Sequence, residues 1–268
     1  MSIKSLQRAQ RIREISLKIV NSAKASHIGS ALSIADLLAV LYSEILYFNP
    51  KKPNEKSRDR FILSKGHACT ALYACLADVG FFELNDLNTY GNDFSVFMNH
   101  VSHKVPGVEF SMGALGHGLP IGCGLALSAK LKRESWRTFV LMSDGELQEG
   151  SNWEAFMFCS HHKLSNITAV IDFNNLQSLT TVEKTINLEP LEQKLKSFGW
   201  RVDIVDGHNH NEINRVFSKT NSDKPNVIIA KTIKGKGVSF MENKVEWHYK
   251  NPNNNELERA LNEVTTKK

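Results

Sequence analysis

The chain has 268 residues, which is enough for one domain with a sizeable core, and its 41% hydrophobic and 23% charged residues are ordinary for a globular protein. Its formal net charge of +5 is carried by scattered basic residues, so it fits an anionic small molecule and is too diffuse for a dedicated nucleic-acid surface. The amino terminus has no apolar core of a secretory signal, and the most apolar stretch, residues 31–48, contains two acids, so we expect a buried helix there. We therefore expect a cytoplasmic protein that binds neither nucleic acid nor membrane.

Periodic apolar residues predict the elements of the first half of the chain. Residues 5–24 should form a helix, because isoleucines recur there at helical spacing. Ser33 should cap a helix that begins near residue 34 and ends at Asn49-Pro50. A short buried strand at 61–63 should be followed by a turn into a helix through 71–73.

The middle of the chain is irregular before regular structure resumes. Residues 84–112 contain Asn, Gly, His and Pro throughout, and a loop of that length is expected to be functional. A glycine-rich segment, 113–118, should lead into a helix that ends near Lys130. The remaining expected elements are a strand at 138–142, a helix at 150–164, strands at 167–173, 200–205 and 227–232, a helix near 212–219 and a terminal helix at 256–264. This alternation predicts an α/β protein with a mostly parallel sheet and helices on both faces.

Two polar side chains follow neighbouring strands of this predicted sheet. Asp144 comes just after one strand, and Asn174 follows the next one, 174 − 144 = 30 residues later. A right-handed crossover brings the carboxyl ends of both strands to one edge, where open α/β sheets bind ligands. Asp-Gly and Asn-Asn are each typical of a simple turn, but their spacing across a crossover favours a Mg²⁺ site that holds a diphosphate.

The four cysteines form no CxxC pair and have no metal-ligand spacing. Each lies among small or apolar neighbours, so we expect all of them to be buried, reduced thiols, as in a cytosolic protein. They are Cys69, Cys75, Cys123 and Cys159.

Several further segments carry a family pattern. In chain order they are SHIGS at 26–30, RDRFILSKGH at 58–67, PGVE at 106–109, GALGHG at 113–118, SDGELQEG at 143–150, KTIKGKG at 231–237 and WH at 247–248. Together they resemble the amino-terminal half of transketolase, a thiamine diphosphate enzyme, in the family's order and over nearly the whole chain. The resemblance implies one thiamine-diphosphate-binding domain over residues 1–268, with a twisted, mostly parallel sheet.

The same resemblance implies a set of ligands. Asp144, the side-chain oxygen of Asn174 and the backbone carbonyl of Leu176 would hold Mg²⁺, with diphosphate oxygens and a water completing the octahedron. Gly145 would let the backbone approach the diphosphate, because a Cβ there would obstruct it. The other implied cofactor contacts are Ser30, His67, Gly113, Ala114, Leu115, Lys234 and His248.

Among the ten histidines, the resemblance assigns catalytic roles to three. His27, His67 and His248 would hydrogen-bond substrate hydroxyls or move protons. His103 is a further candidate, and His208 is expected to be structural. A histidine on its own is more often a surface residue, which is how His100, His161 and His162 are interpreted.

The sequence departs from the family pattern near the expected reaction centre. His117 stands where the family often has Gln, and the loop at 99–105 carries two histidines instead of one. These departures leave the choice of sugar phosphate open. Arg60 is a candidate for holding the sugar phosphate.

The resemblance also implies a partner chain. The family's acid that activates the aminopyrimidine lies on a second, pyrimidine-binding domain, and no counterpart of it is expected within residues 1–268. The chain would then be the first subunit of a split transketolase, active with a carboxyl-terminal subunit, as a heterotetramer. Alternatives are a subunit of another thiamine enzyme, of the deoxyxylulose-phosphate synthase or 2-oxo-acid dehydrogenase type, and a non-catalytic relative that binds only a partner.

Overall fold

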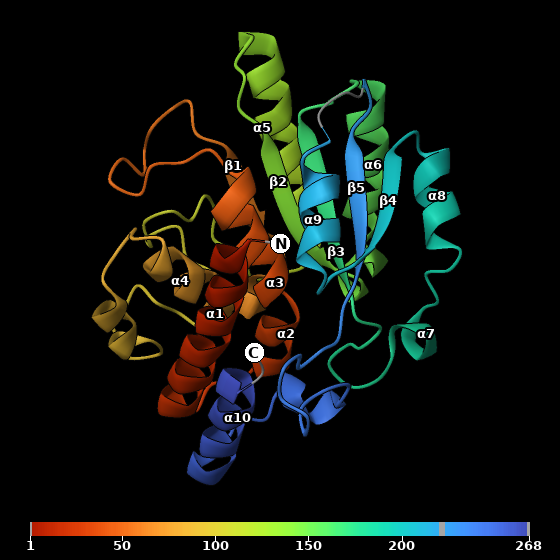
Figure 1. Cartoon of the computed structure of the whole chain (residues 1–268). Coiled ribbons are helices and arrows are strands. Elements are labelled where there is room, and N and C mark those ends of the chain that lie inside the picture. Colours follow the sequence, from red (N-terminus) through yellow and green to blue (C-terminus); the bar gives the residue numbers. More distant parts are fainter. Residues whose placement is uncertain (1, 220–222, 267–268) are drawn as a thin grey trace.

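The computed structural model describes residues 2–219 and 223–266 and consists of one parallel sheet with helices on both faces (Figure 1). The five strands lie in the order β1-β2-β3-β5-β4, and every neighbouring pair is parallel. Their bounds are β1 Arg60–Leu63, β2 Thr138–Ser143, β3 Ile167–Phe173, β4 Arg201–Asp206 and β5 Asn226–Lys231. The prediction of an α/β fold with a parallel sheet is confirmed.

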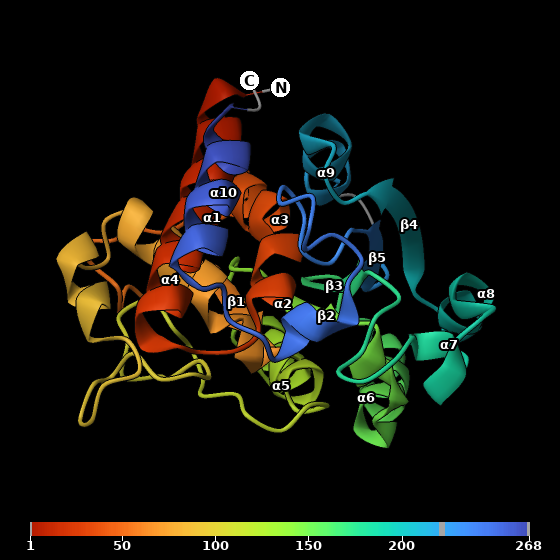
Figure 2. The same ribbon diagram turned by 90° about the horizontal axis from the view of Figure 1, so that it is seen from below.

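Helices cover the sheet from both sides, as Figure 2 shows, with α5 and α6 on one face and α3 and α9 on the other. The helices are α1 Ile3–Ala23, α2 Ile28–Ser33, α3 Ala35–Val40, α4 Cys69–Asp78, α5 Gly118–Lys132, α6 Gly150–His161, α7 Val182–Thr185, α8 Leu191–Ser197, α9 His210–Phe217 and α10 Asn254–Thr266. None of the described helices is long and apolar enough to cross a lipid bilayer. Strands β2, β3 and β5 are almost entirely buried, as expected for a sheet with two covered faces.

Two expectations about local structure are wrong. The helix predicted to begin near residue 34 does begin there, as α3, but it continues into a π-helical turn at Leu41–Ile45 and ends before Asn49-Pro50, and its N-cap is Ile34. Ser33 is therefore the last residue of α2 and caps nothing; its hydroxyl lies 2.7 Å from Asp172 Oδ2. Asp172, a buried carboxylate of β3, accepts a hydrogen bond from the Ser33 hydroxyl, so Ser33 does not cap the helix. No local sequence pattern could reveal this contact.

The cysteines also differ from expectation. Cys123 of α5 and Cys159 of α6 form a disulfide with a Cα–Cα distance of 6.0 Å, so the expectation of four reduced thiols is wrong for this pair. Cys69 and Cys75 are buried free thiols, as expected. The two paired residues are 36 positions apart and meet only because α5 and α6 lie on the same face of the sheet.

A second, smaller core fixes the segment that follows β5. Val238, Met241 and Trp247 are buried against residues of α1, α2 and α10. The Trp247 side chain is 1% exposed, and its Nε1 donates a hydrogen bond to the Phe240 carbonyl at 3.0 Å. Residues 232–248 are therefore held firmly across the carboxyl edge of the sheet, although they contain only a short 3₁₀ turn.

Candidate functional site

A cavity of about 270 Å³ lies at the carboxyl edge of the sheet. Its walls come from the ends of β2 and β3, the start of α2, the turn after β1, and the segment after β5. All the residues implied as ligands or as catalytic histidines line this cavity except Ala114, which is exposed on the neighbouring loop, while the weaker candidates His103 and Arg60 do not. Segments far apart in the chain thus converge where parallel sheets bind ligands.

Asp144 is the buried acid of this cavity and is 1% exposed. Its Oδ1 accepts a hydrogen bond from the Gly145 N–H at 2.7 Å, and its Oδ2 accepts one from the Asn175 N–H at 2.5 Å. Burial, and then the charge of Asp172, raises the pKa of Asp144 to about 7. No described lysine, arginine or histidine forms an ion pair with it, so a cation at this point would compensate a buried negative charge.

Asn174 and Leu176 add two neutral oxygen donors beside Asp144. The Asn174 amide nitrogen donates to Asp172 Oδ2 at 3.0 Å, which fixes the amide orientation, and its Oδ1 accepts from the Leu176 N–H at 3.1 Å. Among the described residues there is no cluster of three or more His, Cys, Asp or Glu that could hold a metal ion. A carboxylate, an amide oxygen and a backbone carbonyl are instead the hard donor set that suits Mg²⁺.

The side chain of Gln177 leaves a buried donor without a partner in the same cavity. Its Nε2 has no hydrogen bond although it is shielded from solvent. A Cβ at Gly145 would lie 2.9 Å from this side chain, so the two residues leave no room for a larger residue at position 145. A buried amide without an acceptor is rare, and an oxygen of a bound anion would satisfy it. Both the donor set and this orphan amide fit a Mg²⁺-diphosphate group.

Lys234 and His248 form another part of the cavity wall. The Lys234 Nζ donates to the carbonyls of Leu176 at 3.1 Å and Gln177 at 3.0 Å, and it lies 2.9 Å from His248 Nδ1. Burial, followed by the charge of Lys65, lowers the pKa of Lys234 to about 8. Lys234 is thus a buried cation, 2% exposed, that an anion in the cavity would stabilise.

Four histidine rings gather above this wall. The His27 ring centroid lies 5.0 Å from those of His67 and His248 and 5.8 Å from that of His100. Burial is the main cause that lowers the pKa of His27 to about 4, that of His248 to about 3, and that of His67 well below its usual value. At neutral pH these rings are uncharged, so each can both donate and accept a hydrogen bond.

His100 is exposed, as the sequence analysis expected, but it also lines the cavity, a role that the sequence analysis did not assign to it. Partial burial lowers its pKa. His161 and His162 lie at the end of α6, away from the cavity, as expected. His103 is exposed, with Nδ1 2.8 Å from Ser111 Oγ, and does not line it.

His117 and Arg60, which the sequence analysis also considered, lie outside the cavity. His117 is exposed, with its Nδ1 2.9 Å from the Leu115 carbonyl. Arg60 begins β1 at the amino edge of the sheet, where its guanidinium lies 4.6 Å from the centre of the Trp136 ring. The suggestion that Arg60 holds a substrate phosphate in this cavity is therefore wrong.

Lys65 is a residue of the site that the sequence analysis did not assign. It is 1% exposed, and its Nζ donates to Asp172 Oδ2 at 2.5 Å and to the Ser30 carbonyl at 3.1 Å. Burial alone would raise the pKa of Asp172, but the ammonium of Lys65 and the hydroxyls of Thr232 and Ser33 lower it. This buried ion pair joins the turn after β1 to the end of β3, beneath the cavity.

Glu146 is the second unassigned residue, and it positions the glycine-rich loop. Its Oε1 accepts hydrogen bonds from the Gly116 N–H at 2.9 Å and from the Ser64 hydroxyl, and the Ser64 oxygen accepts from the Gly118 N–H at 3.0 Å. Glu146 is 0% exposed. It thereby ties the segment that contains Gly113 and Leu115 to β1 and β2.

The remaining lining residues carried weak sequence signals. Ser143, Gln177 and Ser178 flank the predicted ligands directly, and Tyr249 follows His248. His100 lies in the long irregular segment that was expected to be functional. Position along the chain could have suggested all of them, but only their convergence in one cavity assigns them to the site.

Comparisons with known proteins agree with this geometry. Residues 5–265 match the family described as transketolase, thiamine diphosphate binding domain. The chain is 40% identical over 268 residues to one of the subunits of the apulose-4-phosphate transketolase of Phocaeicola vulgatus, covering 99% of this chain and 95% of that protein. It is 36% identical over 240 residues to 6-deoxy-6-sulfo-D-fructose transketolase subunit SqwG of a Clostridium species, covering 88% of this chain and 87% of that protein.

Solved structures show the same fold in longer chains. The transketolase of Campylobacter jejuni superposes with a TM-score of 0.93 at 31% identity, over 99% of this chain and 43% of the other. The chain thus spans less than half the length of that transketolase. On the family match, the identities and the shared fold, this chain belongs to the transketolase family and corresponds to its thiamine-diphosphate-binding domain.

Proposed function

We propose that this chain is the diphosphate-binding subunit of a two-chain transketolase, which transfers a two-carbon ketol unit from a ketose phosphate to an aldose phosphate. One observation carries the proposal: a buried acid without an ion-pair partner, Asp144, shares a cavity with a buried amide without an acceptor, Gln177 Nε2. A divalent cation bound to a diphosphate supplies the missing partner of each.

In this proposal the cavity residues divide the cofactor between them. Asp144, Asn174 and the Leu176 carbonyl hold Mg²⁺, and Lys234 and Gln177 hold the diphosphate. Thiamine diphosphate, when bound, supplies the carbon nucleophile that cleaves a ketose next to its carbonyl. The chain positions the cofactor. Lys65 fixes the end of β3 through Asp172, and Glu146 fixes the glycine-rich loop through the Gly116 N–H.

The neutral histidines perform the protein's part of the chemistry in this proposal. His27, His67 and His100 present rings to the cavity that can donate to a sugar carbonyl or accept from a hydroxyl, whereas His248, whose Nδ1 faces Lys234, can only donate from Nε2. An imidazolium could only donate. The lowered pKa values of these rings therefore favour hydrogen bonds to a sugar over binding of a phosphate by charge.

The partner in this proposal is a chain that carries the pyrimidine-binding domain. Two relatives that this chain matches over most of their length are named as subunits, which supports a division of the enzyme between chains. The resemblance assigns to that domain the acid that activates the aminopyrimidine, and a heterotetramer would place the cofactor between unlike chains. Two exposed apolar residues of α6, Met157 and Phe158, are compatible with a protein contact.

The test is a ketol-transfer assay with the purified chain by itself, with the pyrimidine-domain partner by itself, and with both. We expect turnover only from the mixture. Robust turnover by this chain without its partner would overturn the two-chain proposal. Turnover by the mixture with pyruvate, and none with a ketose phosphate, would indicate another thiamine enzyme class instead.

Activity measured with a panel of substrates identifies the donor sugar. The names of the relatives include apulose 4-phosphate and 6-deoxy-6-sulfo-D-fructose, which differ from each other in their anionic group. We propose a ketose phosphate donor, and the comparison of kcat/KM for a pentulose phosphate, apulose 4-phosphate and the sulfosugar identifies it. Thiamine diphosphate binding without turnover of any donor would favour a non-catalytic role.

A further inference from the structure

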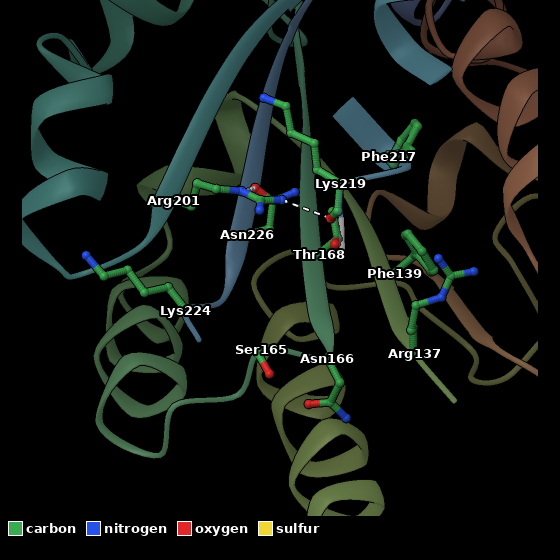
Figure 3. A pocket seen from close by; sticks show the side chains of 10 residues that line it. All are labelled: Arg137, Phe139, Ser165, Asn166, Thr168, Arg201, Phe217, Lys219, Lys224 and Asn226. Atoms are coloured by element: carbon green, nitrogen blue, oxygen red, sulfur yellow. Dashed lines mark hydrogen bonds between the residues drawn. The ribbon is translucent and has the colours of Figure 1, made fainter. Parts of the chain in front are cut away.

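A second cavity, of about 220 Å³, lies at the amino edge of the sheet (Figure 3). It lies among the first residues of four adjacent strands, β2, β3, β5 and β4, and the end of α9. The lining includes Arg137, Asn166, Thr168, Arg201, Lys219 and Asn226. Because β3 separates this edge from the candidate cofactor site and rises about 3.3 Å per residue, the two cavities are roughly 20 Å apart.

The lining of this cavity is cationic. Among the described residues that line it, four are basic and none is acidic, and Lys224 is the fourth basic residue. The other three share two neighbouring carboxylates: Arg137 pairs with Asp59 at 2.7 Å, Lys219 with Asp203 at 2.5 Å, and Arg201 with Asp203 at 3.7 Å. Three cations held around two acids leave a local excess of positive charge.

The arginines of this cavity are held in fixed positions. Arg201 Nε donates to Asn226 Oδ1 at 3.1 Å, and its terminal nitrogen donates to the Lys219 carbonyl at 3.2 Å, drawn as a dashed line in Figure 3. The Arg137 guanidinium lies 5.1 Å from the centre of the Phe139 ring. A guanidinium fixed in this way loses little entropy when it binds an oxyanion.

We propose that this amino-edge cavity binds a phosphate group, either inorganic phosphate or the phosphate of a small monoester. Arg201 and Arg137 provide planar N–H donors, the lysines provide charge, and Thr168 and Asn166 add a hydroxyl and an amide to the lining. This site is separate from the cofactor cavity, and it does not depend on the proposed function. Its ligand would bind to the chain whether or not thiamine diphosphate is present.

The experiment measures how phosphate raises the melting temperature of the purified full chain at constant ionic strength, with Mg²⁺ and thiamine diphosphate present. Three variants are compared with the wild type. One is a double variant that combines Arg201→Gln and Lys219→Gln, and the other two are the single variants Lys132→Gln and Lys234→Gln. Lys132 is exposed at the end of α5 and outside the lining, so it controls for general charge. Each variant is compared with its own phosphate-free state, because loss of the partners of Asp203 changes stability by itself.

We expect the double variant to require about tenfold more phosphate for the same stabilisation, while the Lys132 and Lys234 variants match the wild type. Equal loss in the Lys132 variant would overturn the proposal in favour of diffuse charge. Loss confined to the Lys234 variant would place the phosphate in the cofactor cavity and overturn it as well. Titrations with glycerol phosphate and with sulfate then separate a monoester, free phosphate and any tetrahedral anion.

Discussion

The Nζ atom of Lys234 lies 2.9 Å from Nδ1 of His248. A lysine ammonium can only donate, so Nδ1 accepts and the neutral imidazole carries its proton on Nε2. One buried cation thereby selects the tautomer of a histidine that lines the candidate site. The pair links the charge that would hold an anion to the ring that would exchange hydrogen bonds with a substrate.

The affinity for thiamine diphosphate should fall as the pH rises above about 8. The pKa of Lys234 is lowered to about 8 in the free chain, so the ammonium loses its proton above that pH and no longer attracts the anion. Calorimetric titrations at about pH 7 and about pH 9 should differ by about tenfold in Kd. A Lys234→Arg variant keeps its charge over this range and should lose the difference; an equal dependence in both proteins would contradict this role.

The contribution of Asp144 to the stability of the cofactor-free chain should decrease between about pH 4 and about pH 7. Its pKa is raised to about 7, so the folded state holds a proton that the unfolded state has released. That contribution is complete below the unfolded value of about 4 and is lost as the pH rises through about 7, up to about 4 kcal/mol.

Urea unfolding of the wild type and of Asp144→Asn at several pH values measures this contribution. The difference between the two proteins isolates Asp144, because the histidines with lowered pKa values, which act in the opposite direction, are common to both. The free energy of unfolding of the wild type relative to Asp144→Asn should therefore fall from about pH 4 to about pH 7. Asp93→Asn, at an exposed loop residue, is the matched control and should follow the wild type. A difference between the wild type and Asp144→Asn that does not change with pH would contradict this role of Asp144.

Replacing Lys65 by Met should destabilise the chain by about 3–5 kcal/mol, because it leaves the carboxylate of Asp172 buried without its cation. The control is Lys196→Met, which removes an exposed ion pair with Glu192 and should cost less than about 1 kcal/mol. Denaturant unfolding gives both values. Similar losses in the two variants would mean that the buried pair contributes no more than a surface pair.

His208 should position the segment that carries Lys234. Its Nδ1 lies 2.7 Å from Asp36 Oδ2, and its Nε2 accepts a hydrogen bond from the Ile233 N–H at 2.9 Å. In His208→Ala, hydrogen exchange at the Ile233 amide should accelerate and the affinity for thiamine diphosphate should fall by about tenfold.

The conservative variant His208→Gln can still accept this hydrogen bond and should restore part of the affinity. His103→Ala, at an exposed histidine outside the cavity, is the control. Unchanged exchange at Ile233 in His208→Ala would exclude the positioning role, even if affinity fell.

Local patterns were sufficient for the elements of the sheet. The strands that end at Asp144 and Asn174 are short apolar runs bounded by turn residues, and burial on both faces of the sheet requires such runs. The crossover rule then placed the two side chains at one edge. The prediction that Ser33 caps the helix beginning near residue 34 failed because a buried carboxylate from β3 accepts a hydrogen bond from its hydroxyl instead.

The sequence by itself determined the α/β class, the family pattern and the edge at which Asp144 and Asn174 meet, because these depend on period, order and chain connectivity. Only the tertiary structure decided that Lys65 neutralises Asp172, that His100 joins the histidine cluster, and that Cys123 meets Cys159. Each of these is a contact between segments distant in the chain. Such contacts depend on how helices and loops pack against the sheet, and neither spacing nor composition records that packing.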